Sequence, residues 1–319
     1  MGKSGTFPHW PSPPYDGLKR PEGLAGKEDL ADLRAIGMGL AFAFMWSSAF
    51  TSARIIVADA PPLTTLAIRF LISGLIAVVV ARLLGQSWRL SREQLYATIL
   101  FGICQNALYL GLNFVAMQTI EAAVAAIVAS SLPLLVALFG WALFGERLPH
   151  VGILGLILGI GGVVLIMGSR IGGGVDLFGL VLCGLGALAL TFATLAVRGA
   201  ASGGNVLMVV GLQMLVGSVA LAVAGGVTET LEVRWSWQLV AAFIYTTLIP
   251  GLAATWVWFT LVARIGAVRA ATFHFLNPFF GVAIAALVLG EALGPADLAG
   301  VAIITAGILA VQRARRTAH

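Results

Sequence analysis

Polar side chains interrupt several apolar stretches of this chain in a pattern able to bind a small polar molecule. Asn106, Tyr109 and Asn113 are spaced three and four residues apart, so a helix would carry them on one face. His274 and Asn277 lie in a later apolar stretch. Amide, phenol and imidazole groups form hydrogen bonds, and imidazole also exchanges protons near neutral pH. The alternative is that these groups bond neighbouring helices to each other.

Aromatic and hydroxyl side chains extend this predicted binding surface. Ser47 lies in the first apolar stretch, and Thr194 lies in the corresponding part of the second half of the chain. Aromatic rings would suit a planar or cationic solute through stacking and cation–π contacts. Ordinary core packing is the alternative for the predicted aromatic wall, which consists of Trp46, Tyr109, Tyr245 and Trp256.

Three prolines inside apolar stretches predict bends or breaks in helices. Pro133, Pro250 and Pro278 each remove one helical hydrogen bond. A break in mid-membrane frees backbone carbonyls for a solute, which is a recurrent device of carriers. We therefore predict that these prolines are hinges; a packing kink without a role in transport is the alternative.

The residues needed for catalysis do not come together in the sequence. Intramembrane hydrolysis requires paired Asp residues, a Ser–His pair or clustered metal ligands. Of the four histidines, we place only His274 deep in an apolar stretch, with no carboxylate near it in sequence. The sequence therefore predicts neither an enzyme nor a cofactor or metal site. Without a deep carboxylate, we expect facilitated transport or weak proton coupling through His274.

The composition identifies lipid as the solvent of this chain. Hydrophobic residues make up 59% of it and charged residues 10%, against about 25% charged residues in soluble domains. About 20 apolar residues are needed to cross a bilayer as a helix. Ten such spans are predicted, near residues 34–57, 62–84, 94–117, 120–144, 150–168, 177–199, 204–225, 238–263, 267–289 and 296–313.

An internal repeat organises these spans. Residues 122–166 and 267–311 align without a gap, so that Pro133 and Glu146 correspond to Pro278 and Glu291. Five spans per repeat place the second copy upside down relative to the first. Glu146 and Glu291 each follow a helix and precede another, where a carboxylate accepts free backbone N–H groups and holds the turn. We predict a structural role for both glutamates.

The positions of the basic residues predict the orientation of the chain. The four arginines on the far side are Arg54, Arg69, Arg170 and Arg234. Cytoplasmic loops are rich in Lys and Arg, so both termini are predicted to be cytosolic. The side with the N-terminus holds Lys3, Lys19, Arg20, Lys27, Arg34, Arg82, Arg89, Arg92, Arg147, Arg198, Arg264, Arg269, Arg313, Arg315 and Arg316. The predicted divisions are a disordered cytosolic tail (1–32), two five-helix repeats (33–169 and 170–313) and a cytosolic C-terminal tail (314–319).

Ten spans, a 5+5 repeat and paired Pro-x12-Glu patterns resemble the drug/metabolite transporter superfamily, EamA type. The residues that carry the resemblance are Pro133, Gly145-Glu146, Gly155 and Gly162, with Pro278, Gly290-Glu291, Gly300 and Gly307. The chain is most similar to bacterial aromatic amino acid exporters of the inner membrane. The resemblance implies a central cavity between the halves, lined mainly by the first, third, fourth, sixth, eighth and ninth spans.

The predicted function is therefore transport of small metabolites, aromatic or neutral amino acids foremost, by alternating access across the inner membrane. Export of cationic drugs or other toxic compounds is the alternative, and a channel or an intramembrane enzyme is a distant one. The expected partners are a small-molecule substrate and the lipid bilayer, with no nucleic acid. The chain is expected to act as a monomer or a weak homodimer.

Overall fold

The computed structural model of the chain describes residues 22–145, 149–196, 205–266 and 270–317. Within these ranges every regular element is helical, and the helices form ten segments that are long and apolar enough to span a membrane. The predicted all-α membrane fold is confirmed. In chain order the helices are α1 (Glu22–Asp59), α2 (Pro62–Leu83), α3 (Arg92–Phe101), η1 (Gly102–Tyr109), α4 (Leu110–Ala116), α5 (Ala122–Ser130), α6 (Leu132–Phe144), α7 (His150–Gly172), α8 (Leu177–Ala196), α9 (Val206–Thr228), α10 (Trp237–Thr246), η2 (Thr247–Ala253), α11 (Ala254–Ile265), η3 (Ala271–Leu276), α13 (Asn277–Leu289) and α14 (Pro295–Thr317).

Helix boundaries repeat along the chain. Both ends of α6 and α13 differ by 145 residues, as do both ends of α7 and α14. Gly145 and Gly290 end α6 and α13 in the same left-handed conformation, which glycine adopts at no steric cost. Helix α1 begins at Glu22, inside the segment predicted as a tail, and residues 1–21 lie outside the described part of the chain.

The connections between successive spans alternate between the two ends of the helix bundle. One end, which we call face A, carries the connections that follow α1, α4, α7, α9 and α13. The opposite end, face B, carries the ends of α2, α6, α8, α11 and α14. Helix α7 runs from face B to face A, and its repeat equivalent α14 runs from face A to face B. The two repeats are therefore inverted relative to each other.

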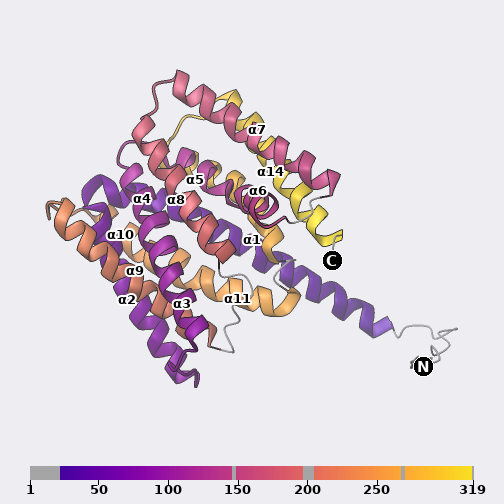
Figure 1. Cartoon of the computed structure of the whole chain (residues 1–319), viewed down its shortest axis with the longest axis horizontal. Helices are drawn as coiled ribbons and strands as arrows, with labels where there is room; N and C mark the ends of the chain where they lie inside the picture. Colours follow the sequence, from indigo (N-terminus) through magenta and orange to yellow (C-terminus); the bar gives the residue numbers. More distant parts are fainter. Residues whose placement is uncertain (1–21, 146–148, 197–204, 267–269, 318–319) are drawn as a thin grey trace, which may run out of the picture.

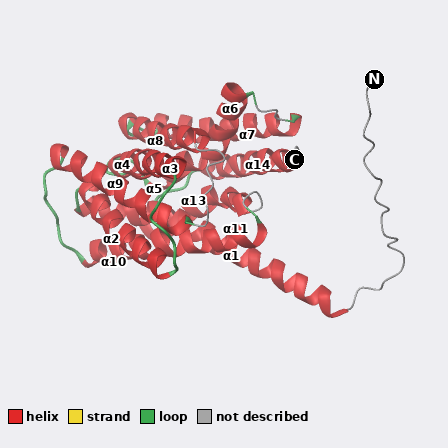
Figure 2. Cartoon of the chain, turned by 60° about the horizontal axis from the view of Figure 1, so that its bottom comes forward, coloured by secondary structure: helices red, strands yellow, loops and turns green. Residues whose placement is uncertain are grey.

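Equivalent helices of the two repeats form pairs on the two flanks of the molecule. Helices α7 and α14 lie side by side on one flank, and α2 and α9 lie together on the other, with α1 passing between the flanks (Figures 1 and 2). The outward sides of α2 and α7 expose large apolar side chains such as Val79 and Val164. Lipid tails are the environment that such surfaces require.

Four glycines let α7 and α14 approach to backbone contact. A methyl group added to Gly307 would come 2.6 Å from the carbonyl oxygen of Gly155, and one added to Gly162 would come 3.0 Å from that of Gly300. Gly155 and Gly162 are the repeat equivalents of Gly300 and Gly307, so the contact is reciprocal, as expected around a pseudo-two-fold axis. Small residues give this close packing in lipid, where no hydrophobic effect drives helices together.

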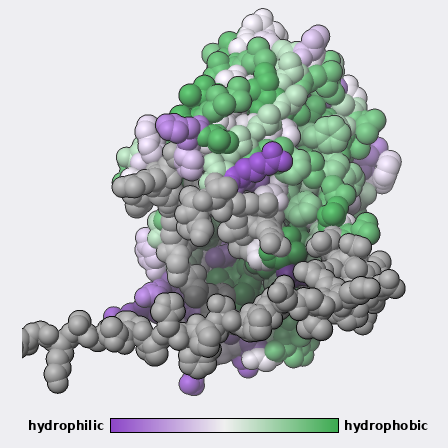
Figure 3. Space-filling model, turned by 90° about the vertical axis from the view of Figure 1, so that its right-hand side faces the viewer, coloured by the Kyte–Doolittle hydropathy of each residue, from purple (hydrophilic) through white to green (hydrophobic). Residues whose placement is uncertain are grey.

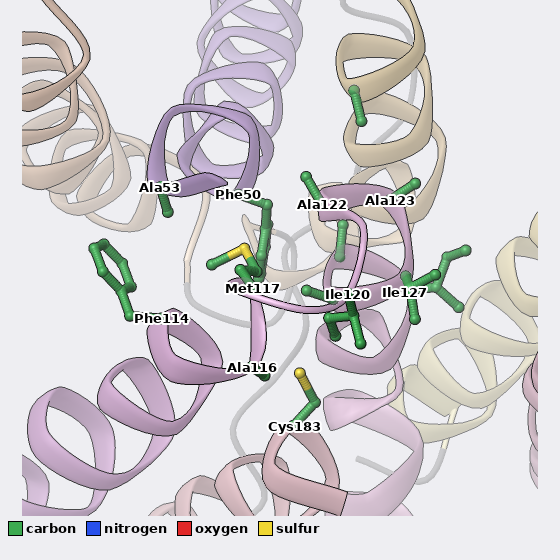
Figure 4. Packing of buried hydrophobic residues seen from close by; sticks show 14 of the residues in the cluster. Phe50, Ala53, Phe114, Ala116, Met117, Ile120, Ala122, Ala123, Ile127 and Cys183 are labelled. Atoms are coloured by element: carbon green, nitrogen blue, oxygen red, sulfur yellow. The ribbon is translucent and has the colours of Figure 1, made fainter. Parts of the chain in front are cut away.

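Part of the buried apolar core lies close to face A. Its side chains include Phe50 of α1, Met117 and Ile120 after α4, and Cys183 of α8. Figure 4 shows these side chains gathered with Ala122, Ala123 and Ile127 of α5. The core thereby fills the space between the repeats at this end of the molecule.

The reciprocal glycine contact predicts a selective loss of stability. Gly307→Ala places a methyl group against the Gly155 carbonyl and the Gly159 backbone nitrogen, 2.5 Å away. We expect a destabilisation of about 1–3 kcal/mol, measured as a lower Tm of the purified protein in detergent. Gly161→Ala is the matched control, because no heavy atom lies within 4 Å of its added methyl group. Equal Tm values for the two variants would contradict the packing described for α7 and α14.

Candidate functional site

A cavity of about 440 Å³ lies between the two repeats. A smaller hollow of about 80 Å³ adjoins it, and the two share Trp46, Phe50 and Tyr109. The larger cavity is lined by residues of both repeats, namely Trp46, Phe50, Tyr109, Ala129, Ser130, Leu132, Pro133, Val136, Leu190, Ala271, His274, Asn277, Val311 and Gln312. The smaller hollow also contains the side chains of Arg69, Asn106 and Asn113.

Irregular helices surround the cavity. The third and eighth spans contain π-helical turns, η1 and η2, at positions that correspond in the two repeats. The fourth span breaks at Ser131, between α5 and α6, and the ninth changes from the 3₁₀ helix η3 to α13 at Asn277. A π-helical turn or a break loosens the regular hydrogen bonds, and lipid cannot replace them. Irregular backbone is therefore tolerated here because it faces an interior cavity.

The structure brings most of the predicted binding residues to these hollows. Trp46, Tyr109, His274 and Asn277 line the larger cavity, and Asn106 and Asn113 line the smaller one. Asn113 also donates to the Tyr109 carbonyl (2.7 Å) and accepts from the Cys183 thiol (3.3 Å), so both polar atoms of its amide already have a partner within the protein. Of the predicted hinges, Pro133 and Pro250 line the two hollows, and Pro278 is buried in the first turn of α13.

Three predicted binding residues do not line the hollows, and their hydroxyl groups form hydrogen bonds within the protein. The Ser47 hydroxyl donates to the Asn277 carbonyl (3.3 Å), and the Thr194 hydroxyl donates to Leu190 (2.7 Å) in its own helix. The Tyr245 hydroxyl lies 2.8 Å from that of Ser48. These polar groups join helices or satisfy their own backbone, which is the alternative that the sequence leaves open for them.

Trp256 does not join the predicted aromatic wall. Its side chain is 69% exposed on the outer side of α11, whereas Trp258 packs against Phe42 and His274 with centroid distances of 4.7 and 5.1 Å. Positions 256 and 258 lie about 200° apart around a helix. Each tryptophan shares its helical face with a threonine, Trp258 with Thr255 and Trp256 with Thr260, so no contrast with polar residues indicates which one points inward.

His274 lies in an aromatic enclosure formed with α1 and α11. Its ring meets those of Phe42 and Trp46 edge to face, with centroid distances of 5.1 and 6.3 Å. Nδ1 lies 2.9 Å from the side-chain nitrogen of Asn277, which can only donate. In this arrangement Nδ1 accepts, and a neutral His274 carries its proton on Nε2. The Asn277 oxygen Oδ1 is buried without a hydrogen-bond partner.

Arg69 is the charged residue that the sequence reasoning misplaced. The sequence places Arg69 with the basic residues on the far side of the membrane, whereas its side chain is buried against η2 and lines the smaller hollow. Arg69 lies seven residues after Pro62, close enough to the helix start to be counted among the basic residues at the membrane surface. Its burial between α2 and η2 depends on tertiary packing.

Polar contacts close face A. Arg170 at the end of α7 binds Glu121 (2.5 Å) and Asp297 (2.8 Å), which joins α7 to the starts of α5 and α14. Asp176 accepts from the Thr119 hydroxyl (2.6 Å) and the Gly179 backbone N–H (3.0 Å). These two hydrogen bonds favour the charged carboxylate and lower the pKa of Asp176 from its usual value.

Glu291 links the two repeats at this closed face. Its carboxylate accepts the backbone N–H groups of Ala122 and Ala123 at 2.7 and 2.9 Å, at the start of α5. From the sequence, Glu291 is expected to accept the free N–H groups of the helix that follows it, which begins at Pro295. The helix that Glu291 caps belongs to the other repeat, so no sequence neighbour indicates it. Glu146 lies outside the described residues.

The larger cavity extends toward face B. Leu190 of α8 and Gln312 of α14 lie in the halves of their helices that end at that face, and Gln312 donates to the Ala271 carbonyl (2.9 Å) there. Figure 3 views this end of the molecule and shows a recess with hydrophobic side chains between two lobes. The predicted cavity-lining spans all contribute, and α2, α9 and α14 line the hollows as well.

Comparisons with known proteins agree with this architecture. The family model described as the EamA-like transporter family matches residues 33–168 and 177–312, one match in each repeat. The "Uncharacterized transporter YvbV" of Bacillus subtilis is 29% identical over 84% of this chain and 88% of its own length. "Protein PecM" of Dickeya dadantii is 25% identical over 82% of this chain and 86% of its own. A crystal structure with 22% identity shares the fold, with a TM-score of 0.62 over 90% of this chain and 99% of its own.

The Glu291 cap predicts a measurable contribution to stability. Glu291→Gln removes the charge that accepts two N–H groups and brings an amide donor toward them. We expect a loss of about 1–3 kcal/mol, measured as a lower Tm in detergent. Glu93→Gln is the matched control, because Glu93 is exposed near the start of α3. If both variants melt like the wild type, Glu291 does not hold face A together.

Proposed function

The chain belongs to the EamA-like transporter family, and from this premise we propose that it carries amino acids with aromatic or other neutral side chains across the inner membrane. It is a multi-pass membrane protein of a family of small-molecule transporters. Membership of a transporter family also favours the predicted absence of enzymatic activity. We infer that transport occurs by alternating access, with a single chain as the functional unit.

One observation carries this proposal: a cavity built by both repeats is closed toward face A and extends toward face B. Trp46 and Ser130 come from the first repeat, and His274 and Asn277 from the second. Ion pairs and the Glu291 cap hold face A closed. A carrier requires a site that reaches one side of the membrane at a time, between halves able to rearrange.

The size and lining of the cavity suit a small amphipathic solute. Ligand sites typically have volumes of roughly 300–1,000 Å³, and the cavity of about 440 Å³ falls in this range. Trp46 and Tyr109 offer ring surfaces, while His274 and Asn277 offer hydrogen-bonding groups. An amino acid with an aromatic side chain has both kinds of surface.

We further propose that face B is the cytosolic side and that both termini lie there. Arg82, Arg89, Arg92 and Arg264 cluster near the helix ends at face B. The sequence counts Arg69 among the basic residues at face A, but Arg69 is buried in the interior. The excess of basic residues at face B over face A is therefore larger than the sequence predicts. Positive residues favour the cytosolic side of a membrane protein.

Transport of cationic compounds is a weaker alternative. Aromatic rings attract cations, but the formally charged side chain that lines the described hollows is Arg69. A positive charge in a cavity of low polarity repels a cationic solute and attracts the carboxylate of an amino acid.

Proteoliposome counterflow with labelled phenylalanine tests this proposal. We expect saturable exchange that falls about tenfold in Trp46→Ala and Tyr109→Ala, because each loses a ring that faces the solute. We also expect His274→Ala to weaken exchange. Trp256→Ala is the matched control and should exchange like the wild type, since that ring is 69% exposed outside the cavity. Absence of saturable exchange, or equal losses in Trp46→Ala and Trp256→Ala, would refute the proposed carrier site.

A further inference from the structure

Arg69 holds a positive charge within the second membrane span. It lies seven residues after the first residue of α2, which corresponds to about 10 Å along the helix axis. The residue is only 6% exposed. A charged side chain at this depth requires a partner or a water-filled cavity, and such residues commonly mark the path of a solute.

The groups that surround Arg69 leave its charge uncompensated. Its Nε donates to the Thr246 carbonyl at 3.3 Å, and its Cζ lies 5.0 Å from the ring centroid of the adjacent Phe70. Both are neutral groups. The ion pairs found among the described residues join Arg170 and Arg234 to carboxylates near face A, and none involves Arg69. A guanidinium has five N–H donors, so most of its hydrogen-bonding capacity remains available.

A second polar group without a partner lies close to Arg69. The Ser73 hydroxyl, one turn further along α2, is buried and makes no hydrogen bond. A methyl group added to Gly251 would lie 3.1 Å from the Thr246 carbonyl oxygen, 3.2 Å from the Arg69 Nη2 and 3.6 Å from the Ser73 hydroxyl oxygen. The guanidinium and the hydroxyl therefore flank one spot beside η2, which the glycine keeps free of a side chain.

This spot adjoins the cavity already described. Arg69 and Gly251 line the smaller hollow, which shares Trp46, Phe50 and Tyr109 with the larger cavity. A planar guanidinium binds a carboxylate through two parallel N–H···O hydrogen bonds. A neighbouring hydroxyl can donate a further one. A solute with its ring against Trp46 or Tyr109 would thus have an anion-binding group within the same hollow.

We propose that Arg69 is the residue that binds the carboxylate of the transported solute, and that the site selects for anionic or zwitterionic molecules against cations. This inference rests on the proposed function and narrows its substrate class. A purely structural role, in which Arg69 only supports the Thr246 carbonyl of the irregular eighth span, predicts no such selectivity.

The test measures binding to the purified full-length chain in detergent by isothermal titration calorimetry. Three probes share one ring and differ in charge: phenylacetate is an anion, phenylacetamide is neutral and 2-phenylethylamine is a cation at pH 7. The variants are Arg69→Gln, Arg69→Lys and Ser73→Ala. Arg82→Gln is the matched control, because Arg82 lies on the same helix but is exposed near face B. Size-exclusion profiles and Tm values show which variants fold.

We expect the wild type to bind phenylacetate more tightly than the other two probes. Arg69→Gln should weaken phenylacetate binding about tenfold or more, since a buried charge pair is lost, and should leave phenylacetamide binding unchanged. Arg69→Lys, which keeps the charge without the planar fork, and Ser73→Ala should each cause a smaller loss. Arg82→Gln should bind like the wild type. If Arg69→Gln fails to fold, the test rests on the loss of phenylacetate affinity in Arg69→Lys and Ser73→Ala.

Three results would overturn the inference: no binding of phenylacetate to the wild type, a preference for 2-phenylethylamine, or unchanged phenylacetate affinity in the folded Arg69 variants. Phenylalanine counterflow on the same preparations distinguishes failure of the Arg69 inference from failure of the proposed carrier function. Saturable counterflow without selectivity for the anion removes the role of Arg69 and leaves the carrier in place. Absence of counterflow removes the carrier itself.

Discussion

The hydrocarbon of a bilayer offers no hydrogen bonds, and this constraint determines where the chain can depart from a regular helix. Helices α2, α7, α9 and α14 run without a break, and the flanks that they form expose apolar side chains. The third, fourth, eighth and ninth spans contain π turns, breaks or 3₁₀ turns, and all of them border the interior hollows. Irregular backbone and polar side chains are therefore concentrated in the one region where a solute can meet them.

Duplication of an odd number of spans accounts for the symmetry of this region. Gly155 meets Gly307 and Gly162 meets Gly300, so residues at equivalent positions exchange roles across α7 and α14. The same inversion places the irregular spans of both repeats around one cavity. It also brings Glu291 of the second repeat onto the start of α5 in the first, at the closed face. Closure of face A thus depends on contacts between repeats, which a rearrangement of one repeat against the other would alter.

Much of the fold was predictable from the sequence because membrane spans and repeats leave strong signals. Apolar length alone locates ten spans, and the constant spacing of 145 residues anticipates the matching ends of α6 and α13. The left-handed glycines at positions 145 and 290 also lie where the repeat places them. Pro250 signals the irregular eighth span. The corresponding π turn in η1 contains no proline, so no residue in it indicates the irregularity.

The candidate site was less predictable, because orientation around a helix requires a contrast between polar and apolar neighbours. Asn106, Tyr109 and Asn113 supply this contrast, and they do face the hollows. Trp256 and Trp258 lack it. Arg69 was misjudged for a different reason: distance from a loop along the sequence does not report burial, which here arises from η2 packed against α2.

The claim on which this account depends is that one cavity between inverted repeats reaches each side of the membrane in turn. Ser130→Cys, in a chain with Cys104 and Cys183 replaced by alanine, places a thiol in that cavity. A membrane-impermeant maleimide would be applied to right-side-out and inside-out vesicles, with and without a phenylalanine gradient. The account predicts labelling from both sides, with the gradient increasing labelling from one side as it decreases labelling from the other. Labelling from a single side under every condition would contradict it.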